Sequence, residues 1–475
     1  MTDPSFAELP LAHCRRRRGL LPSTPWILVG FVLASCATYE PAPLEPSALY
    51  EDLQQRGTTT LSDAAPQSPS PWFPLASVIA PEDGLTLAEA NTLALIYSPA
   101  IRAVRLRAKT SRVAALYAGL LENPELSLGP QISTRTNELI FPISLSWQLP
   151  LFGQVEAERE ALGAAEREQL LEVVLAEFEV LKDIREKFLR AASLKSQIEA
   201  LDQAQQELTK LLVAVEALVA LREADAVLLF LVRTEQETLE VERMERVADL
   251  RTVERDLRHL LGLLPDASVA FETESPDLPT LEPSELLPSP LLRLPKVQRA
   301  AFAYEVAEAE LRHEITKQFP AITLGPSGES DRGEGLLGIG LGITLPFFQR
   351  NQGGIAKAET ARDGARLSYQ DALLAATHEA DAARAQYEAA RERIEHFRNG
   401  PMKDVDAVVA AMRTQEKAGR FAVLERISAE RAMTDGFLRL LKLEEQVLMT
   451  TFDWAYRRGQ AFAPGTTAFG QELLP

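Results

Sequence analysis

Two short segments of the chain alternate strictly between large apolar residues and small or polar ones. The apolar positions are Ile143, Leu145, Trp147, Leu149, Ile339, Leu341, Ile343 and Leu345. The positions between and beside them are Ser144, Ser146, Gln148, Gly338, Gly340, Gly342 and Thr344. A period of two predicts strands with one apolar face. The pattern is typical of a strand between lipid and an aqueous lumen, and also of a strand in a soluble sandwich.

These segments belong to two copies of one longer pattern. Four prolines of the first half recur in the second half with a constant offset of 196 residues. The pairs are Pro99 and Pro295, Pro124 and Pro320, Pro130 and Pro326, and Pro150 and Pro346. Since the register holds across both strand segments without a gap, we interpret the body as a tandem duplication, with repeats at 85–265 and 285–460.

Each repeat has the same predicted order: a first helix, a strand pair, a very long helix and a return helix. The expected bounds are 85–121 and 297–318 for the first helices, about 125–149 and 321–345 for the strand pairs, 155–221 and 351–417 for the long helices, and about 226–262 and 422–458 for the return helices. At 1.5 Å per residue, the long helices would be roughly 100 Å long.

Local signals refine these elements. Thr86 followed by Glu89 predicts a capping box at the start of the first helix. Apolar residues at seven-residue spacing predict a coiled-coil seam in the first long helix: Leu194, Leu201, Leu208 and Val215. Pro401, after Gly400, predicts a kink in the second.

The length of each strand pair favours a membrane over a soluble sandwich. The prolines that bound each pair leave room for two strands of ~10 residues, which is the length that a bilayer requires. Aromatic residues gather at one end of the strands, as in an interfacial girdle: Trp147, Phe152, Phe347 and Phe348. Because four strands cannot close a barrel and open edges are not tolerated in lipid, oligomerisation is expected; three copies would supply twelve strands around a lumen.

The first residues resemble an export signal. Arg15 to Arg18 precede a short apolar core at 26–33. Leu33-Ala34-Ser35-Cys36 resembles a bacterial lipobox, which implies cleavage after residue 35, acylation of Cys36 and, with Ala37 next, sorting to the outer membrane. The alternative is an ordinary signal peptide with a chance cysteine. Residues 36–84 are predicted as an extended Pro-rich tether, 266–284 as a linker and 461–475 as a tail.

Composition narrows the functional classes. The net charge of −18 argues against a nucleic-acid partner. Cys14 and Cys36 are the two cysteines, and the five histidines show no metal-ligand spacing, so neither a metal site nor a cofactor is expected. Gly338, Gly340 and Gly342 lie inside a predicted strand and are not directly followed by a helix, so a nucleotide-binding loop is not expected. No enzyme signature is found.

The order of elements and the strand-to-helix junctions resemble the outer-membrane efflux (TolC-like) family over residues 85–458. The junctions are Leu149-Pro150-Leu151-Phe152-Gly153 and Leu345-Pro346-Phe347-Phe348-Gln349-Arg350-Asn351-Gln352-Gly353. The resemblance implies an α+β membrane protein: a homotrimer with a twelve-stranded β-barrel, two hairpins coming from each chain, and a long periplasmic coiled-coil tunnel. It also implies a passive exit duct in the outer membrane that docks to a periplasmic adaptor and an inner-membrane pump, of the resistance-nodulation type. Arg350 to Gly353 favour the metal-cation branch.

Two alternatives stay open: a duct for an ABC-driven type I secretion or drug pump, and a structural coiled-coil lipoprotein. The gate is expected at the turns between long and return helices. Its candidate residues are Glu223, Asp225, Gly419 and Arg420. Rings of carboxylates there would concentrate cations. The alternative is that these residues form turns or adaptor contacts; Glu223 also replaces a glycine that is frequent in the family.

Overall fold

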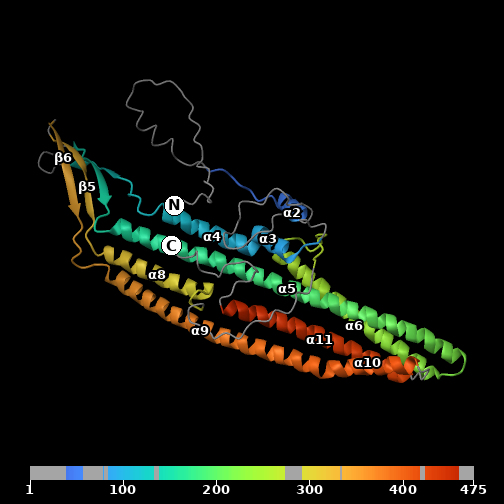
Figure 1. Cartoon of the computed structure of the whole chain (residues 1–475). Coiled ribbons are helices and arrows are strands. Elements are labelled where there is room, and N and C mark those ends of the chain that lie inside the picture. The colour runs from blue at the N-terminus through green and yellow to red at the C-terminus, as the bar shows by residue number, and fades with distance from the viewer. Residues whose placement is uncertain are drawn as a thin grey trace.

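The molecule is elongated, with a β-sheet at one end and helical hairpins at the other (Figure 1). The computed structural model describes residues 39–56, 79, 84–132, 139–272, 291–331, 334–417 and 423–458. The predicted signal segment, Cys36 and the tail at 461–475 lie outside the described residues.

The two repeats have the predicted order of elements. The first contains α3 (Leu87–Tyr97), α4 (Pro99–Leu116), β1 (Glu125–Leu128), β2 (Gln131–Ile132), β3 (Leu139–Ile140), β4 (Ile143–Leu149), α5 (Gln154–Ala220) and α6 (Ala226–Leu260). The second contains α8 (Pro295–Thr316), β5 (Ile322–Asp331), β6 (Glu334–Ile343), α9 (Gln352–Asn399), α10 (Pro401–Lys417) and α11 (Val423–Arg457). The long helix α5 spans 67 residues without a break.

Proline decides where helices break. The prediction of one continuous helix at 85–121 is wrong, because α3 ends at Tyr97 and α4 begins at Pro99. Ser98 between them is extended, with ψ 120°, as expected for a residue before proline. The kink predicted at Pro401 is confirmed, since α9 ends at Asn399 and α10 starts at Pro401. The Thr86–Glu89 capping box is also present.

Two segments predicted as extended or linking are partly structured. Pro46–Gln55 forms helix α2, so the prediction of an extended tether is wrong there. Pro46 occupies the first turn, where its fixed φ favours a helix, and no proline follows within the helix. The linker predicted from residue 266 begins inside the core of the first repeat: Phe271 is buried and bridges to Leu85.

The strands form one antiparallel four-stranded sheet with the order β1-β4-β5-β6, and β2 pairs with β3 in a short extension. The two repeats therefore join through β4 and β5. Close approach at this joint requires glycine at position 325, because a Cβ there would lie 1.6 Å from the carbonyl oxygen of Leu145.

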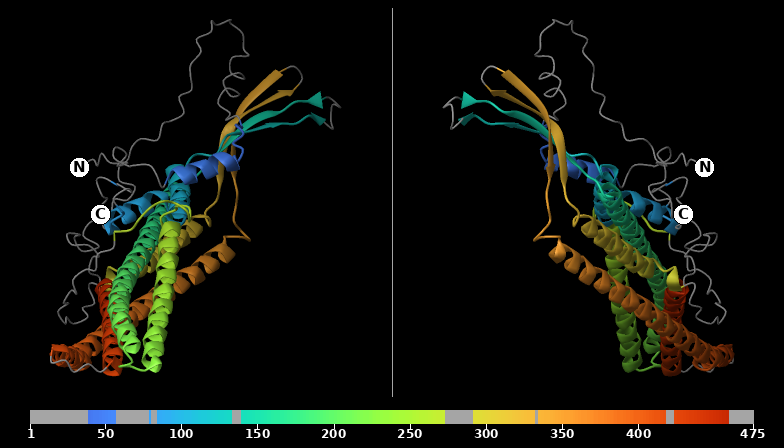
Figure 2. Two further views of the ribbon diagram at one scale, coloured as in Figure 1. Left: turned by 90° about the vertical axis from the view of Figure 1, so that its right-hand side faces the viewer. Right: turned by 90° about the vertical axis from the view of Figure 1, so that its left-hand side faces the viewer.

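The helices below the sheet repeat the order of the strands. α4 packs on α5, α5 on α8 and α8 on α9, so that each helix continues the layer begun by its strand (Figure 2). α6 returns along α5 and α11 along α9 and α5. The predicted seam of α5 is confirmed, because Leu194, Leu201, Leu208 and Val215 are all buried. Within the described chain, no helix is long and apolar enough to cross a bilayer.

Candidate functional site

The sheet has two chemically different faces. Leu149 lies opposite Ile322, which lies opposite Ile343, and Trp147, Leu324 and Leu341 form a parallel row. Residues directly opposite each other on neighbouring strands share a face, so the apolar residues predicted to face lipid gather on one side across both hairpins. Many of them are exposed in the single chain; Ile339 is 80% exposed.

The other face carries the small residues. Ser144 lies opposite Ser327, which lies opposite Gly338, and a second row joins Gln148, Thr323 and Gly342. Gly340 pairs with Gly325, and Ser146 pairs with Glu125, a carboxylate that the prediction of the lumen face did not include. Thr344 and Leu345 follow the end of β6, where the Thr344 amide donates to the Ala321 carbonyl at 3.0 Å.

Both outer strands keep one free edge. Among the described residues, β1 pairs with β4 alone and β6 with β5 alone. A free edge presents a row of unpaired backbone donors and acceptors, which another strand can satisfy. The sheet of one chain is therefore open at both edges, and one of its two faces is apolar.

The junction between the second hairpin and α9 is fixed by Asn351. This residue has φ 57°, in the left-handed region that asparagine tolerates better than most residues. Its side-chain amide donates to the Glu314 carboxylate at 2.6 Å and to the Glu314 carbonyl at 2.9 Å. The hydrogen bond from Asn351, with a second from Lys317, lowers the pKa of Glu314 below its usual 4.5.

The tip of the first repeat is a tight turn. Arg222 has φ 60°, and the Glu223 amide donates to the Leu218 carbonyl at 2.9 Å. Asp225 precedes α6 as its N-cap residue, but its side chain makes no capping hydrogen bond. Glu223 and Asp225 are both exposed. Gly419 and Arg420, the predicted counterparts at the second tip, lie outside the described residues, so the grouping of the four gate candidates stays a prediction.

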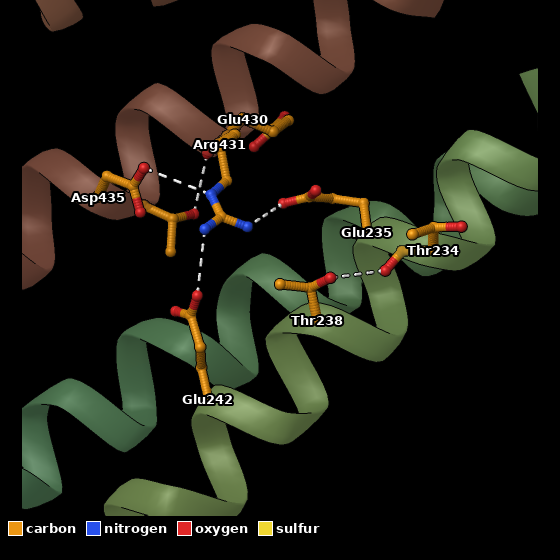
Figure 3. A network of polar contacts seen from close by, with 8 residues as sticks. Thr234, Glu235, Thr238, Glu242, Glu430, Arg431 and Asp435 are labelled. Carbon is orange, nitrogen blue, oxygen red and sulfur yellow. Dashed lines mark hydrogen bonds and ion pairs between the residues drawn. The ribbon is translucent and has the colours of Figure 1, made fainter.

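A polar network close to the tips joins the two return helices. Arg431 of α11 donates to Glu235 at 2.8 Å and to Glu242 at 3.1 Å, both on α6, and to Asp435 of its own helix at 3.3 Å (Figure 3). The hydrogen bond to Glu235 and the surrounding carboxylates raise the pKa of Arg431 above its ordinary value, so the cation persists at any physiological pH.

Sequence reasoning missed this network, although a signal for it exists. Arg431 and Glu235 differ by 196 positions, which is the offset of the duplication. A search for opposite charges at equivalent positions of the two repeats would have found the pair.

A metal centre is not indicated: within the described ranges, no group of three or more histidine, cysteine, aspartate or glutamate side chains could hold a metal ion. The candidate functional groups in the described residues are the polar residues of the small-residue sheet face, of the strand-to-helix junctions and of the helix tips.

Comparisons with known proteins agree with this architecture. Residues 286–451 match the family described as outer membrane efflux protein. The cobalt-zinc-cadmium resistance protein CzcC of Cupriavidus metallidurans is 25% identical over 225 residues, which are 46% of this chain and 54% of the relative. The chain thus spans about half the length of that curated relative in the alignment.

Solved structures extend the similarity to most of the chain. A structure of CusC matches with a TM-score of 0.67 and 18% identity, covering 79% of this chain and 92% of the other. The Campylobacter jejuni CmeC outer membrane channel matches with a TM-score of 0.66 and 14% identity, covering 92% and 96%. The second repeat thus resembles the outer membrane efflux protein family over residues 286–451, and most of the chain shares the fold of these solved structures.

Proposed function

We propose that the chain is the outer-membrane exit duct of a tripartite efflux system. Three copies would close their sheets into a β-barrel and their helices into a periplasmic tunnel. The observation that carries the proposal is the continuous layer of β1-β4-β5-β6 above α4, α5, α8 and α9, which has one apolar sheet face, one small-residue face and two open edges. Such a layer is a segment of a cylinder, because open edges cannot remain unpaired in lipid.

The proposed partners follow from this position. A passive duct needs an energised pump in the inner membrane and an adaptor between them, and the exposed helix tips are the part of the chain farthest from the sheet (Figure 1). Exposed apolar residues near the first tip offer a surface for the adaptor: Leu221, Val227, Phe230 and Leu231. Opening of the tip would break contacts of Glu223 or Asp225 with Arg420 or a neighbouring copy.

Heavy-metal cations are the proposed cargo. The relative CzcC is named for cobalt, zinc and cadmium resistance, and the small-residue face of this sheet presents hydroxyl and amide groups with Glu125 among them. A passage lined by hydroxyl, amide and carboxylate oxygens suits cations better than anionic solutes. The alternative cargo is that of an ABC-driven secretion or drug pump, and the proposed lipid anchor at Cys36 serves either duct equally.

Channel measurements test the proposal. The purified chain should form a heat-resistant trimer in detergent and conduct ions in planar bilayers, whereas a structural coiled-coil lipoprotein would do neither. Deleting the gene should raise the Zn²⁺, Co²⁺ and Cd²⁺ content of cells exposed to these metals. Unchanged metal content together with greater drug or protein retention would contradict the metal cargo, and mass spectrometry of the mature N-terminus tests acylation of Cys36.

A further inference from the structure

The two outer helices of the layer each leave one face uncovered. α4 packs on α5 through Ile101 and Ala108, and its opposite face is exposed; its residues are Arg102, Leu106, Lys109, Val113 and Tyr117. α9 packs on α8 through Ala376 and Ala380. Its opposite face is exposed too, with Asp363, Leu367, Asp371, Leu374 and Asp381.

The two free faces have opposite charge. No acidic residue occurs from Pro99 to Leu121, in a chain whose net charge is −18. Arg102 and Lys109 make no ion pair with any residue that the structure describes. On α9, the free face carries three aspartates between apolar leucines, and the only ion pair of Asp363 in the described chain is with the adjacent Arg362, at 3.1 Å. A basic and an acidic stripe with similar apolar spacing are complementary.

The duplication shows how the faces would meet. At the offset of 196, α9 corresponds to α5, and α4 corresponds to α8. α5 and α8 form the interface between the two repeats inside one chain. In a closed ring, the equivalent interface joins α9 of one copy to α4 of the next.

Residue pairs support this correspondence. Ala164 and Ala309 are buried in one cluster inside the chain, and their equivalents Thr360 and Val113 are exposed. Leu171 is 4% exposed, whereas its equivalent Leu367 is 65% exposed. These exposed residues on the free faces of α4 and α9 are therefore equivalent to residues that are buried on α8 and α5 within the chain.

The charges at one such pair are reversed. Inside the chain, Arg167 of α5 lies 3.9 Å from Glu305 of α8. The equivalents of these two residues are Asp363 on α9 and Lys109 on α4. The base is on α5 and the acid on α8 inside the chain, whereas the acid is on α9 and the base on α4 at the free faces. An ion pair could form in both cases.

We infer that α9 of one copy docks on α4 of a second copy with Asp363 opposite Lys109, and that the reversed charge keeps this seam distinct from the internal one. If α4 of a second copy replaced α8 on α5, Lys109 would face Arg167, and like charges would oppose each other. If α9 approached α8 of another copy, Asp363 would face Glu305. The inference deepens the proposed function and rests on its self-association, but it fixes the register and the order of the helices.

Cross-linking tests the register. In the full chain, Lys109→Cys together with Asp363→Cys should give covalent dimers and trimers on oxidation, because the two positions lie on opposite edges of one chain and can meet only between copies. Each single variant, and Arg107→Cys with Asp363→Cys, should give little covalent dimer or trimer once the non-covalent trimer has been fully denatured. Arg107 is a matched control because it lies on the flank of α4 and has no ion pair among the described residues.

Charge reversal tests the specificity. Lys109→Glu should lower the fraction of heat-resistant trimer at least severalfold, Arg107→Glu should not, and Lys109→Asp combined with Asp363→Lys should restore the trimer. A trimer that conducts ions but neither cross-links at 109 and 363 nor responds to Lys109→Glu would overturn the seam and leave the proposed duct intact. A wild-type chain that stays monomeric in detergent and lipid would overturn both.

Discussion

Arg431 and Glu235 occupy equivalent positions of the two repeats and bind each other, with 2.8 Å between guanidinium nitrogen and carboxylate oxygen. The pair thus joins α11 to α6, the return helices of the two repeats. A second acceptor on α6, Glu242, makes the contact a three-membered link between helices of different repeats. Such a link holds the two return helices at one separation.

In the proposed duct, loss of this link should increase the fraction of open channels. Each partly exposed pair contributes up to about 1 kcal/mol, so Arg431→Ala should shift the opening equilibrium by about 1–2 kcal/mol, or roughly 5–30-fold. The measurement is the spontaneous conductance of the purified protein in planar bilayers. Arg431→Glu with Glu235→Arg should return conductance toward the wild-type level.

Arg439 provides the matched control on the same helix. It is exposed and forms no ion pair with the residues described, so Arg439→Ala should leave the conductance unchanged. Equal leak from Arg431→Ala and Arg439→Ala would show that the network is a surface feature without influence on opening.

The joint between the two hairpins should depend on Gly325. A Cβ at this position would lie 1.6 Å from the Leu145 carbonyl oxygen, which is backbone and cannot rotate away. Gly325→Ala should therefore separate β4 from β5, with a cost of about 1–3 kcal/mol or more, and should lower the thermal stability of the proposed trimer. Gly335→Ala, where a Cβ would meet nothing within 4 Å, should assemble like the wild type.

The sequence predicted the frame of this fold because its signals are periodic and duplicated. A period of two placed Ile143 to Leu149 in β4, and the shared offset carried the same assignment to β6. The break at Ser98-Pro99 was missed because the hydrophobic pattern continues through it, although the proline itself marks it. Helix α2 was missed because proline content outweighed the position of Pro46 in a first helical turn.

The candidate site was less predictable because it depends on tertiary approach. Period-two alternation separates the two faces of a strand but cannot tell which residues lie opposite each other, so Glu125 was not assigned to the small-residue face with Ser146. The Arg431 network joins equivalent positions of the two repeats, so the offset of 196 could have indicated the pair, but no local pattern shows that α6 and α11 approach each other there. Placement of Gly419 and Arg420 stays a prediction.

A buried ion pair should stabilise the attachment of α4 to α5. Glu177 is 1% exposed and accepts from the Arg105 guanidinium at 2.6 and 3.0 Å, while a further Arg105 nitrogen donates to the Leu95 carbonyl. Arg105→Ala would remove this cation from a buried carboxylate, at a cost of about 3–5 kcal/mol. Thermal unfolding followed by circular dichroism measures the loss.

A double variant distinguishes two causes of lower stability: the lost attraction between Arg105 and Glu177, and the burial of the remaining carboxylate. Arg105→Ala with Glu177→Ala should be more stable than Arg105→Ala alone, because the desolvated carboxylate is gone. Arg102→Ala, one turn away on the exposed face, should leave the monomeric fold unaffected. If the single and double variants unfolded at the same temperature, desolvation of Glu177 would not govern the stability of this joint.

The junction of the second hairpin with α9 should lose stability in acid. The pKa of Glu314 is lowered from its usual 4.5 by hydrogen bonds from Asn351 and Lys317, so the folded protein binds this proton less readily than the unfolded chain. The resulting stabilisation is fully present above pH 4.5 and is lost as the pH falls through the lowered pKa. Glu314→Gln should remove this part of the pH dependence and lower the unfolding temperature near neutral pH.

Asn351→Gly distinguishes the hydrogen bonds from the backbone requirement at this junction. Glycine adopts the φ of 57° without strain, so this variant removes the two bonds to Glu314 and keeps the left-handed conformation. It should reproduce the loss seen in Glu314→Gln, whereas Asn351→Ala should be less stable still, because alanine also opposes positive φ. Glu359→Gln on the exposed side of α9 serves as the control for a lost carboxylate. An acid-induced loss of stability below pH 4.5 that is the same in Asn351→Gly and wild type would show that Asn351 does not hold Glu314 in its ionised form.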